Sequence, residues 1–388
     1  MKRIILSLDG TWQTADQDNP SNIHLMHECF AATDKDGNEQ RLKHFDGVGT
    51  KGGKLKQIWA GLTGSDVSSR IKEAYKYLVE NYESGDEVVL SGFSRGAFTA
   101  RTLNGMIYKC GILDGTKAEN IDIDEAVDEA YSFYKNNIKP QNKGAIQYRI
   151  DHSHEQRPQV ILACFDTVGS LGVPAQLRTL GGIFNKRHAF HDTRVNPHTK
   201  HAFHIAAIDE QRKNFPVTPM TSCKDATTSV KQIWFSGNHA AIGGGSSKNK
   251  NKPLSDNAGI AMIKLLENDA GLAFDHDKVN ERFTPDPLVN PQSDFKQKGL
   301  IWKISGLHTK RPISLKEAFD FSVMDRWNAI TNYRPSELKK FLFKDADNAE
   351  TRRSLRCVCY AKAHADINVE WESRRAWSSS GPRRISCI

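Results

Sequence analysis

Short apolar runs alternate with longer amphipathic segments along the first 270 residues of the chain. Five of these runs are rich in Val, Ile and Phe, and we expect each to form a buried strand: 3–8, 87–91, 159–165, 202–208 and 230–235. Short, mostly apolar runs of this kind are typical of parallel strands that helices cover on both faces. The alternation of strand and helix segments therefore predicts a doubly wound, mostly parallel α/β sheet.

Between these strands, apolar residues recur at the spacing of a helix. The segments with this spacing are 71–82, 123–134 and 260–266. Gly85 follows the first of them, and glycine is common directly after a helix. Ser314 and Glu317 have the spacing of a capping box, which predicts the start of another helix.

The chain shows no sharp linker. Two stretches interrupt the strand and helix pattern: 111–151, with one helix and a polar loop, and 169–201, rich in histidine. Residues 271–299 are rich in Asp, Asn and Pro and are interpreted as loop. We therefore expect one α/β catalytic domain over 1–270 that carries both insertions. A C-terminal extension over 271–388 would pack on it and end in a basic tail.

The composition excludes several classes of protein. The chain has 388 residues, a formal net charge of +8 and 26% charged residues, so it is neither disordered nor fibrous. No apolar stretch is long enough for a transmembrane helix. The first apolar run is too short for a signal peptide, so we expect the protein to be cytoplasmic as synthesised. Seven scattered cysteines without a C-x-x-C pair indicate free thiols.

Much of the positive charge lies at the C-terminal end. Residues 351–388 hold eight Lys and Arg against three Asp and Glu. Such a tail either contacts an anionic surface, such as a membrane, or is simply solvated. Nucleic acid is the less favoured partner.

The strongest chemical signal is the sequence Gly-Phe-Ser-Arg-Gly at 92–96, which matches G-x-S-x-G. It directly follows a predicted strand and precedes a predicted helix, which is the context of a nucleophile elbow. Gly92 and Gly96 relieve clashes at the strained turn, so the hydroxyl of Ser94 can project above the sheet. The N–H of Arg95 would then face a developing oxyanion. The alternative is a structural turn without chemistry.

A serine nucleophile needs a base and an acid that orients it. Asp166 stands at the end of the predicted strand 159–165, and His239 follows the end of strand 230–235. Both positions lie at the carboxyl edge of a parallel sheet, where functional groups gather. The chain order Ser94, Asp166, His239 is that of α/β hydrolases.

Asp9, Gly10 and Thr11 follow the first predicted strand. Gly10 or Thr11 is a candidate for the second oxyanion N–H. Asp9 either holds this loop by hydrogen bonds or closes the strand as an Asx turn.

Several further motifs occur in a fixed order along the chain. They are LDGTW at 8–12, SNI at 21–23, FDGVGT at 45–50, GLTG at 61–64, RIKEAYKYLVENYESGDEVVLSGFSRGAFTAR at 70–101, FDTVGSLG at 165–172, FHDT at 190–193, AAIDEQR at 206–212 and WFSGNHAAIGGG at 234–245. Together they resemble the catalytic domain of the type VI secretion phospholipase effectors of the first lipase class, and the wider uncharacterised α/β-hydrolase family around it. The resemblance covers roughly residues 3–270.

This resemblance implies an α/β-hydrolase-like fold and a Ser94–Asp166–His239 triad that acts on ester bonds, with phospholipid as the substrate class. It also implies export by a contact-dependent secretion system and an immunity or adaptor protein as partner. Two positions depart from the family pattern. Ala241 stands where the family often has an acid, and Ser236 replaces a proline.

Other candidate residues lie near the predicted site. His191 and Asp192, in the FHDT motif, are expected to support the rim. Five histidines between 188 and 204 recur at spacings of three, but we expect no metal and no cofactor. The segment Asp209–Arg212 is interpreted either as a functional pair of carboxylates or, in preference, as an ion-pair network that braces the sheet. Three lysines after the triple glycine either attract a phosphate-bearing substrate or belong to a solvated loop: Lys248, Lys250 and Lys252.

The sequence therefore predicts a serine hydrolase of carboxylic esters, most specifically a phospholipase or lipase-type toxin or effector that works through an acyl-enzyme. Two alternatives remain open: a hydrolase of a soluble ester, thioester or amide, and a non-catalytic binding protein on a hydrolase scaffold.

Overall fold

In the computed structural model, the parallel sheet has the order β2-β1-β3-β4-β6-β8-β9 over the part of the chain that the structure describes. The described residues are 1–10, 18–47, 64–117, 122–168, 194–212, 215–222, 228–245, 252–289, 311, 313 and 318–343. The strands are β1 (Lys2–Leu8), β2 (Glu39–Phe45), β3 (Glu87–Phe93), β4 (Gln159–Phe165), β6 (Thr199–Ala207), β8 (Ser229–Phe235) and β9 (Ala318–Phe319). Each neighbouring pair is parallel. Two further short strands, β5 (Arg194–Val195) and β7 (Thr221–Ser222), pair with each other.

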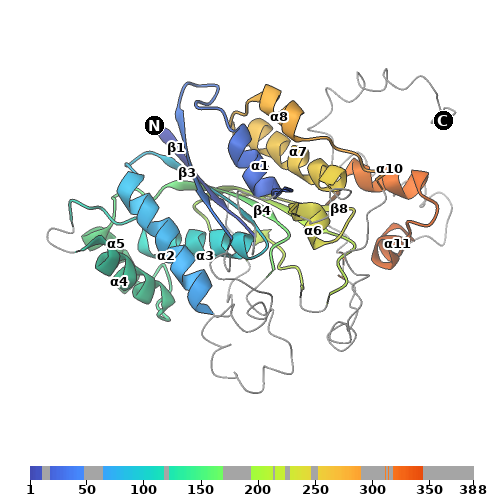
Figure 1. The fold of residues 1–388 in the computed structure, drawn as a ribbon. Coiled ribbons are helices and arrows are strands. Elements are labelled where there is room, and N and C mark those ends of the chain that lie inside the picture. Colours follow the sequence, from blue (N-terminus) through green and yellow to red (C-terminus); the bar gives the residue numbers. More distant parts are fainter. Residues whose placement is uncertain are drawn as a thin grey trace.

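Helices cover both faces of this sheet (Figure 1). On one face lie α2 (Gly64–Asn81), α3 (Arg95–Cys110), α4 (Ile123–Lys135) and α5 (Lys143–His152). On the other lie α1 (Asn22–Cys29), α7 (Lys252–Asn268) and α8 (His276–Arg282). The short α6 (His239–Gly243) precedes α7, and α10 (Phe321–Ala329) and α11 (Ser336–Phe343) follow β9.

The alternation of side chains along each strand explains the two layers. Leu6 and Leu90 belong to the apolar cluster under α2 and α3, whereas Ile5 and Val89 belong to the cluster under α1 and α7. Successive side chains of a strand point to opposite faces, so an uninterrupted apolar run buries both faces at once. The predicted fold class, a doubly wound and mostly parallel α/β sheet, is therefore confirmed.

The five predicted strands are all present, and the fourth begins three residues earlier than expected. The helical segments 71–82, 123–134 and 260–266 correspond to α2, α4 and α7. Strand β2 was not predicted, because its sequence Glu-Gln-Arg-Leu-Lys-His-Phe has no apolar run. It lies at the edge of the sheet, where one strand partner is enough and polar residues are tolerated.

Two stretches interpreted from the sequence differ in the structure. Stretch 111–151 contains two helices rather than one, because Asn142 caps α5 by accepting from the Gly144 N–H. Stretch 271–299, interpreted as loop, contains α8, whose N-cap Asp275 accepts from the N–H groups of Asp277 and Lys278. In both cases a capping side chain starts a helix that apolar spacing does not reveal. The capping box at 314–317, the tail at 351–388 and most of 169–201 lie outside the described residues.

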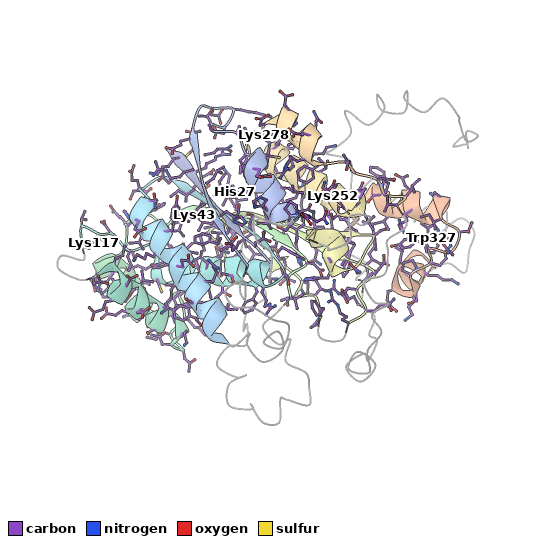
Figure 2. All side chains as sticks on the ribbon, viewed as in Figure 1. His27, Lys43, Lys117, Lys252, Lys278 and Trp327 are labelled. Carbon is purple, nitrogen blue, oxygen red and sulfur yellow. The ribbon has the colours of Figure 1, made fainter. Side chains whose placement is uncertain are left out.

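A third apolar cluster joins the segment after residue 311 to the edge of the sheet. Phe319 of β9 pairs with Trp234 of β8, and Trp327 of α10 packs in the same cluster (Figure 2). Val323 and Leu338 complete the contact from the two last helices. Burial of such large side chains stabilises this contact by roughly 2 kcal/mol each. The division of the chain at residue 270 stays a prediction.

None of the helices among the described residues combines the length and the apolar character that a membrane crossing needs.

Candidate active site

Ser94 occupies the sharp turn between β3 and α3. Its backbone has φ 57 and ψ −116, a left-handed conformation that side chains rarely adopt. The turn is held from both sides: the N–H of Ser94 donates to the carbonyl of Phe165 (3.0 Å), and its own carbonyl accepts from Phe98 (3.1 Å). This strained strand–turn–helix is the geometry expected of a nucleophile elbow.

The glycines on either side of Ser94 allow close packing of the backbone. A Cβ atom on Gly96 would lie 2.0 Å from the carbonyl oxygen of Leu8, and one on Gly92 would lie 2.5 Å from the carbonyl oxygen of Gly96. Real Cβ atoms do not approach backbone this closely. A side chain at Gly96 would push the start of α3 away from β1, and one at Gly92 would push it away from β3.

We expect Gly96→Ala to lower the thermal stability of the protein, because the added methyl group forces apart β1 and α3. Overpacking of this kind costs about 1–3 kcal/mol. Thermal unfolding measures the effect, and Gly115→Ala is the matched control because a Cβ there meets nothing within 4 Å. Equal melting temperatures for the two variants would contradict the predicted close contact.

The structure brings Ser94, Asp166 and His239 into one line of hydrogen bonds. The Nε2 atom of His239 lies 2.8 Å from the Oγ atom of Ser94. On the other side of the ring, Nδ1 lies 2.5 Å from Oδ2 of Asp166. Asp166 follows β4 with a φ of 40, and His239 opens α6 after the N-cap Asn238. These three side chains, far apart in the sequence, thus have the arrangement that activates a serine hydroxyl.

The surroundings of this line favour an ionised acid through the charge of Arg311, and a neutral base through burial. Burial raises the pKa of the Asp166 carboxyl, but the charge of Arg311 and the hydrogen bonds from His239 and Arg311 lower it well below its usual range. For His239, burial lowers the pKa, and the contact with Asp166 offsets part of this effect. A neutral imidazole whose Nδ1–H donates to a carboxylate leaves Nε2 free to accept the serine proton.

Aromatic rings hold the imidazole of His239 from two sides. The ring of Phe93 lies 4.7 Å away, and that of Phe215 lies 5.0 Å away in a T-shaped arrangement. The guanidinium of Arg212 lies 3.5 Å above the Phe215 ring and pairs with Glu210. Such packing restricts the rotation of the imidazole, so its orientation toward Ser94 is fixed.

The predicted ion-pair network at 209–212 is present only in part. Glu210 pairs with Arg212 and also accepts from the backbone N–H of His239 (3.2 Å). Asp209 instead accepts from the Gly237 N–H (2.7 Å) and from the Tyr333 hydroxyl (3.0 Å). Both acids therefore shape the loop that carries the base, because each binds a backbone N–H of that loop.

The sequence offered no signal for Arg311, a buried residue that contacts the candidate acid. Its guanidinium donates to both oxygens of Asp166, at 2.5 Å and 3.0 Å. Motif analysis could not find it, because a single arginine in a divergent segment matches no pattern.

The loop after β1 is tied down by Asp9. Its carboxylate accepts from the Gly10 N–H (2.7 Å) and the Ser21 hydroxyl (2.8 Å), and it lies 3.3 Å from Nε2 of His44. The Gly10 N–H, expected as a second oxyanion donor, is thus occupied by the neighbouring carboxylate, which corrects that expectation. Thr11 lies outside the described residues. The N–H of Arg95, at the start of α3, stays the predicted oxyanion donor.

The lysines predicted near the mouth of the site give a second correction. Lys252 lies on α7 (Figure 2), and its Nζ donates to Asp256 (2.6 Å) and to the carbonyl of Arg282 (2.7 Å). These contacts bind Lys252 between α7 and α8 instead of offering it to a substrate. Lys248 and Lys250 lie outside the described residues, as do His191 and Asp192.

The histidines near β6 have separate surroundings. His198 stacks on Tyr108, with ring centroids 5.0 Å apart. The Nε2 atom of His204 accepts from the Thr167 N–H (3.1 Å), which supports the turn after Asp166. His188 and His191 are not described. Among the residues that are described, no group of three His, Cys, Asp or Glu side chains could hold a metal ion.

Comparison with known proteins gives a family and a distant relative. The family model "T6SS, Phospholipase effector Tle1-like, catalytic domain" matches residues 2–265. The uncharacterized protein YEL023C of Saccharomyces cerevisiae is 26% identical over 238 residues, which are 56% of this chain and 33% of the yeast protein. The chain thus spans about a third of the length of that curated relative.

Three solved structures are similar to parts of this chain at low TM-scores. An uncharacterized protein from Pseudomonas aeruginosa has a TM-score of 0.38 and 15% identity, over 74% of this chain and 49% of its own. The Tle1 effector bound to the VgrG spike of the type 6 secretion system has a TM-score of 0.35 and 18% identity, over 66% and 52%. An esterase from Thermogutta terrifontis has a TM-score of 0.34 and 14% identity, over 70% and 84%.

Proposed function

Since the chain belongs to the family of T6SS phospholipase effector Tle1-like catalytic domains, we propose that it is a serine hydrolase that cleaves carboxylic ester bonds of phospholipids. The observation that carries the proposal is the line of hydrogen bonds from Ser94 through His239 to Asp166, with distances of 2.8 Å and 2.5 Å.

In the proposed reaction, the Oγ atom of Ser94 attacks the acyl carbonyl while Nε2 of His239 takes its proton. The imidazolium ion that forms is stabilised by the carboxylate of Asp166. The negative charge on the carbonyl oxygen is stabilised by the N–H of Arg95 at the start of α3. His239 then gives its proton to the leaving alcohol, which produces an acyl-enzyme.

Water completes the cycle. His239 takes a proton from a water molecule, which attacks the acyl group on Ser94. The fatty acid leaves, and the proton returns to Ser94. No cofactor takes part in the proposed reaction, because every proton transfer uses the same imidazole.

Family membership also supports a role as a toxin or effector. In this part of the proposal, a contact-dependent secretion system delivers the protein to an anionic membrane surface, and an immunity or adaptor protein binds it. These partners and this delivery stay predictions.

The experiment that tests the substrate class compares two kinds of ester, phospholipids in vesicles and a soluble ester. We expect vesicles of phosphatidylethanolamine and phosphatidylglycerol to release fatty acid and lysophospholipid, measured by mass spectrometry, faster than p-nitrophenyl butyrate is hydrolysed. Hydrolysis of the soluble ester without lipid release would point to a soluble substrate. Turnover of neither ester would favour a binding protein on a hydrolase scaffold.

A further inference from the structure

Arg311 and the candidate acid form a buried ion pair with two hydrogen bonds, unlike a simple ion pair at the surface. Its Nη1 atom lies 2.5 Å from Oδ1 of Asp166, and its Nη2 atom lies 3.0 Å from Oδ2. Both side chains are buried, with 3% and 0% of their surface exposed. The two parallel contacts fix the plane of the carboxylate, because the guanidinium and carboxylate groups are both flat.

Backbone carbonyls hold the guanidinium in its own place. Nη1 also donates to the carbonyl of Ala207 (3.0 Å), and Nη2 donates to the carbonyl of Phe215 (2.7 Å). The N–H of Ala207 donates in turn to Oδ1 of Asp166 (3.0 Å). The end of β6 thus positions the arginine and the acid together.

The oxygen of Asp166 that contacts His239 also contacts Arg311. Oδ2 accepts from Nη2 of Arg311 and also faces Nδ1 of His239. The positive charge of Arg311 therefore neutralises part of the negative charge that would stabilise a protonated His239. A nearby cation weakens the proton affinity of an imidazole and keeps it neutral to lower pH.

Arg311 comes from outside the family-matched region, which ends at residue 265. It stands seven residues before β9, which pairs with β8 through Ala318 and Phe319. Because β8 leads directly to the loop that carries His239, the same edge of the sheet anchors both the base and the segment that supplies the arginine.

We propose that Arg311 is a positioning residue of the candidate triad, which orients the carboxylate of Asp166 and limits the basicity of His239. This inference rests on the proposed function, and it deepens it by assigning a part of the site to the C-terminal segment. Arg311 acts through Asp166 and does not touch the substrate.

Other charged groups also face the imidazole and stay unchanged in the test. They are Glu210 and Arg212, which follow β6, together with Asp166 after β4. His204 of β6 lies close to both Asp166 and Arg311, and burial lowers its pKa to about 4, so it stays neutral at pH 7.

The test measures kcat and KM for p-nitrophenyl butyrate across pH in Arg311→Gln and Arg311→Lys. In Arg311→Gln we expect kcat to fall about 10- to 100-fold, as happens when a partner that orients a metal ligand is lost, with KM unchanged. The acid limb of the pH profile of kcat/KM is the range in which activity falls as His239 becomes protonated. This limb should shift to a pH about one unit higher, because loss of the cation raises the pKa of His239. In Arg311→Lys the positive charge remains, so the acid limb of the pH profile should stay near that of the wild type. The kcat should still fall, because one ammonium group cannot span both oxygens of Asp166.

Arg326→Gln is the matched control. Arg326 is also buried in the C-terminal segment, but it donates to the carbonyls of Pro287 and Val289. We expect it to lose thermal stability and to keep the kcat and the acid limb of the wild type. An Arg311→Gln variant that behaves like Arg326→Gln would overturn the proposal and leave a structural role only.

Two further measurements apply if Arg311→Gln does not fold or if the wild type is inactive. If Arg311→Gln does not fold, Arg311→Lys decides, since an unchanged kcat in that variant would overturn the proposal. If the wild type hydrolyses no ester, the proposed function fails, and an NMR titration of the His239 imidazole still tests the inference. An imidazole pKa that is the same with and without the Arg311 guanidinium would refute it.

Discussion

Replacement of Ser94 by alanine is expected to remove almost all hydrolytic activity. The methyl group cannot attack a carbonyl, and loss of the nucleophile in a comparable triad lowers kcat by about 10⁶-fold. The fold should persist, because the backbone contacts of Ser94 with Phe165 and Phe98 do not involve its side chain. The measurement is the turnover of p-nitrophenyl butyrate and of phospholipid vesicles, together with covalent labelling by a fluorophosphonate probe.

Ser91→Ala is the matched control for this substitution. Ser91 is also buried in β3, where its hydroxyl donates to the carbonyl of Leu6 (3.2 Å). We expect Ser91→Ala to keep both turnover and labelling. A Ser94→Ala protein that still hydrolyses these esters would rule out the proposed nucleophile.

Asp166→Asn is expected to have the second largest effect, a loss of about 10⁴-fold in kcat. The amide group would donate to Nδ1 of His239, so the ring proton would move to Nε2 and block acceptance of the Ser94 proton. The same change leaves Arg311 without its counter-ion. A buried charge without a partner costs about 3–5 kcal/mol, so the variant should also melt at a lower temperature.

Asp34→Asn separates the loss of chemistry from the loss of stability. Asp34 is a buried acid that pairs with Arg3 (3.2 Å), at the end of the sheet away from the candidate site. This control should lose thermal stability and keep its kcat. If Asp166→Asn merely matched Asp34→Asn, with a lower melting temperature and a normal kcat, then Asp166 would not be the acid of the triad.

The elements that could be predicted from the sequence have signals that lie within a few neighbouring residues. The central strands were found because apolar runs such as 159–165 bury both faces of a sheet. Ser94, Asp166 and His239 were found because each follows a predicted strand, and the structure places them within hydrogen-bonding distance. Their catalytic role stays a prediction.

The parts that could not be predicted depend on contacts between distant segments. Whether the Gly10 N–H faces an oxyanion depends on the rotamer of Asp9, and here it donates to that carboxylate. Whether Lys252 faces a substrate depends on the packing of α7 against α8, and here it is bound to Asp256. Such outcomes are set by partners that lie elsewhere in the chain.

Local periodicity and spacing therefore identified the sheet, the elbow and the three residues of the candidate triad, because strands and tight turns impose their demands on consecutive residues. The charge next to Asp166 became visible only in the folded chain. Arg311 lies 145 residues from the acid that it contacts. A hydrogen bond between side chains depends on distance in space, and no rule of sequence spacing records it.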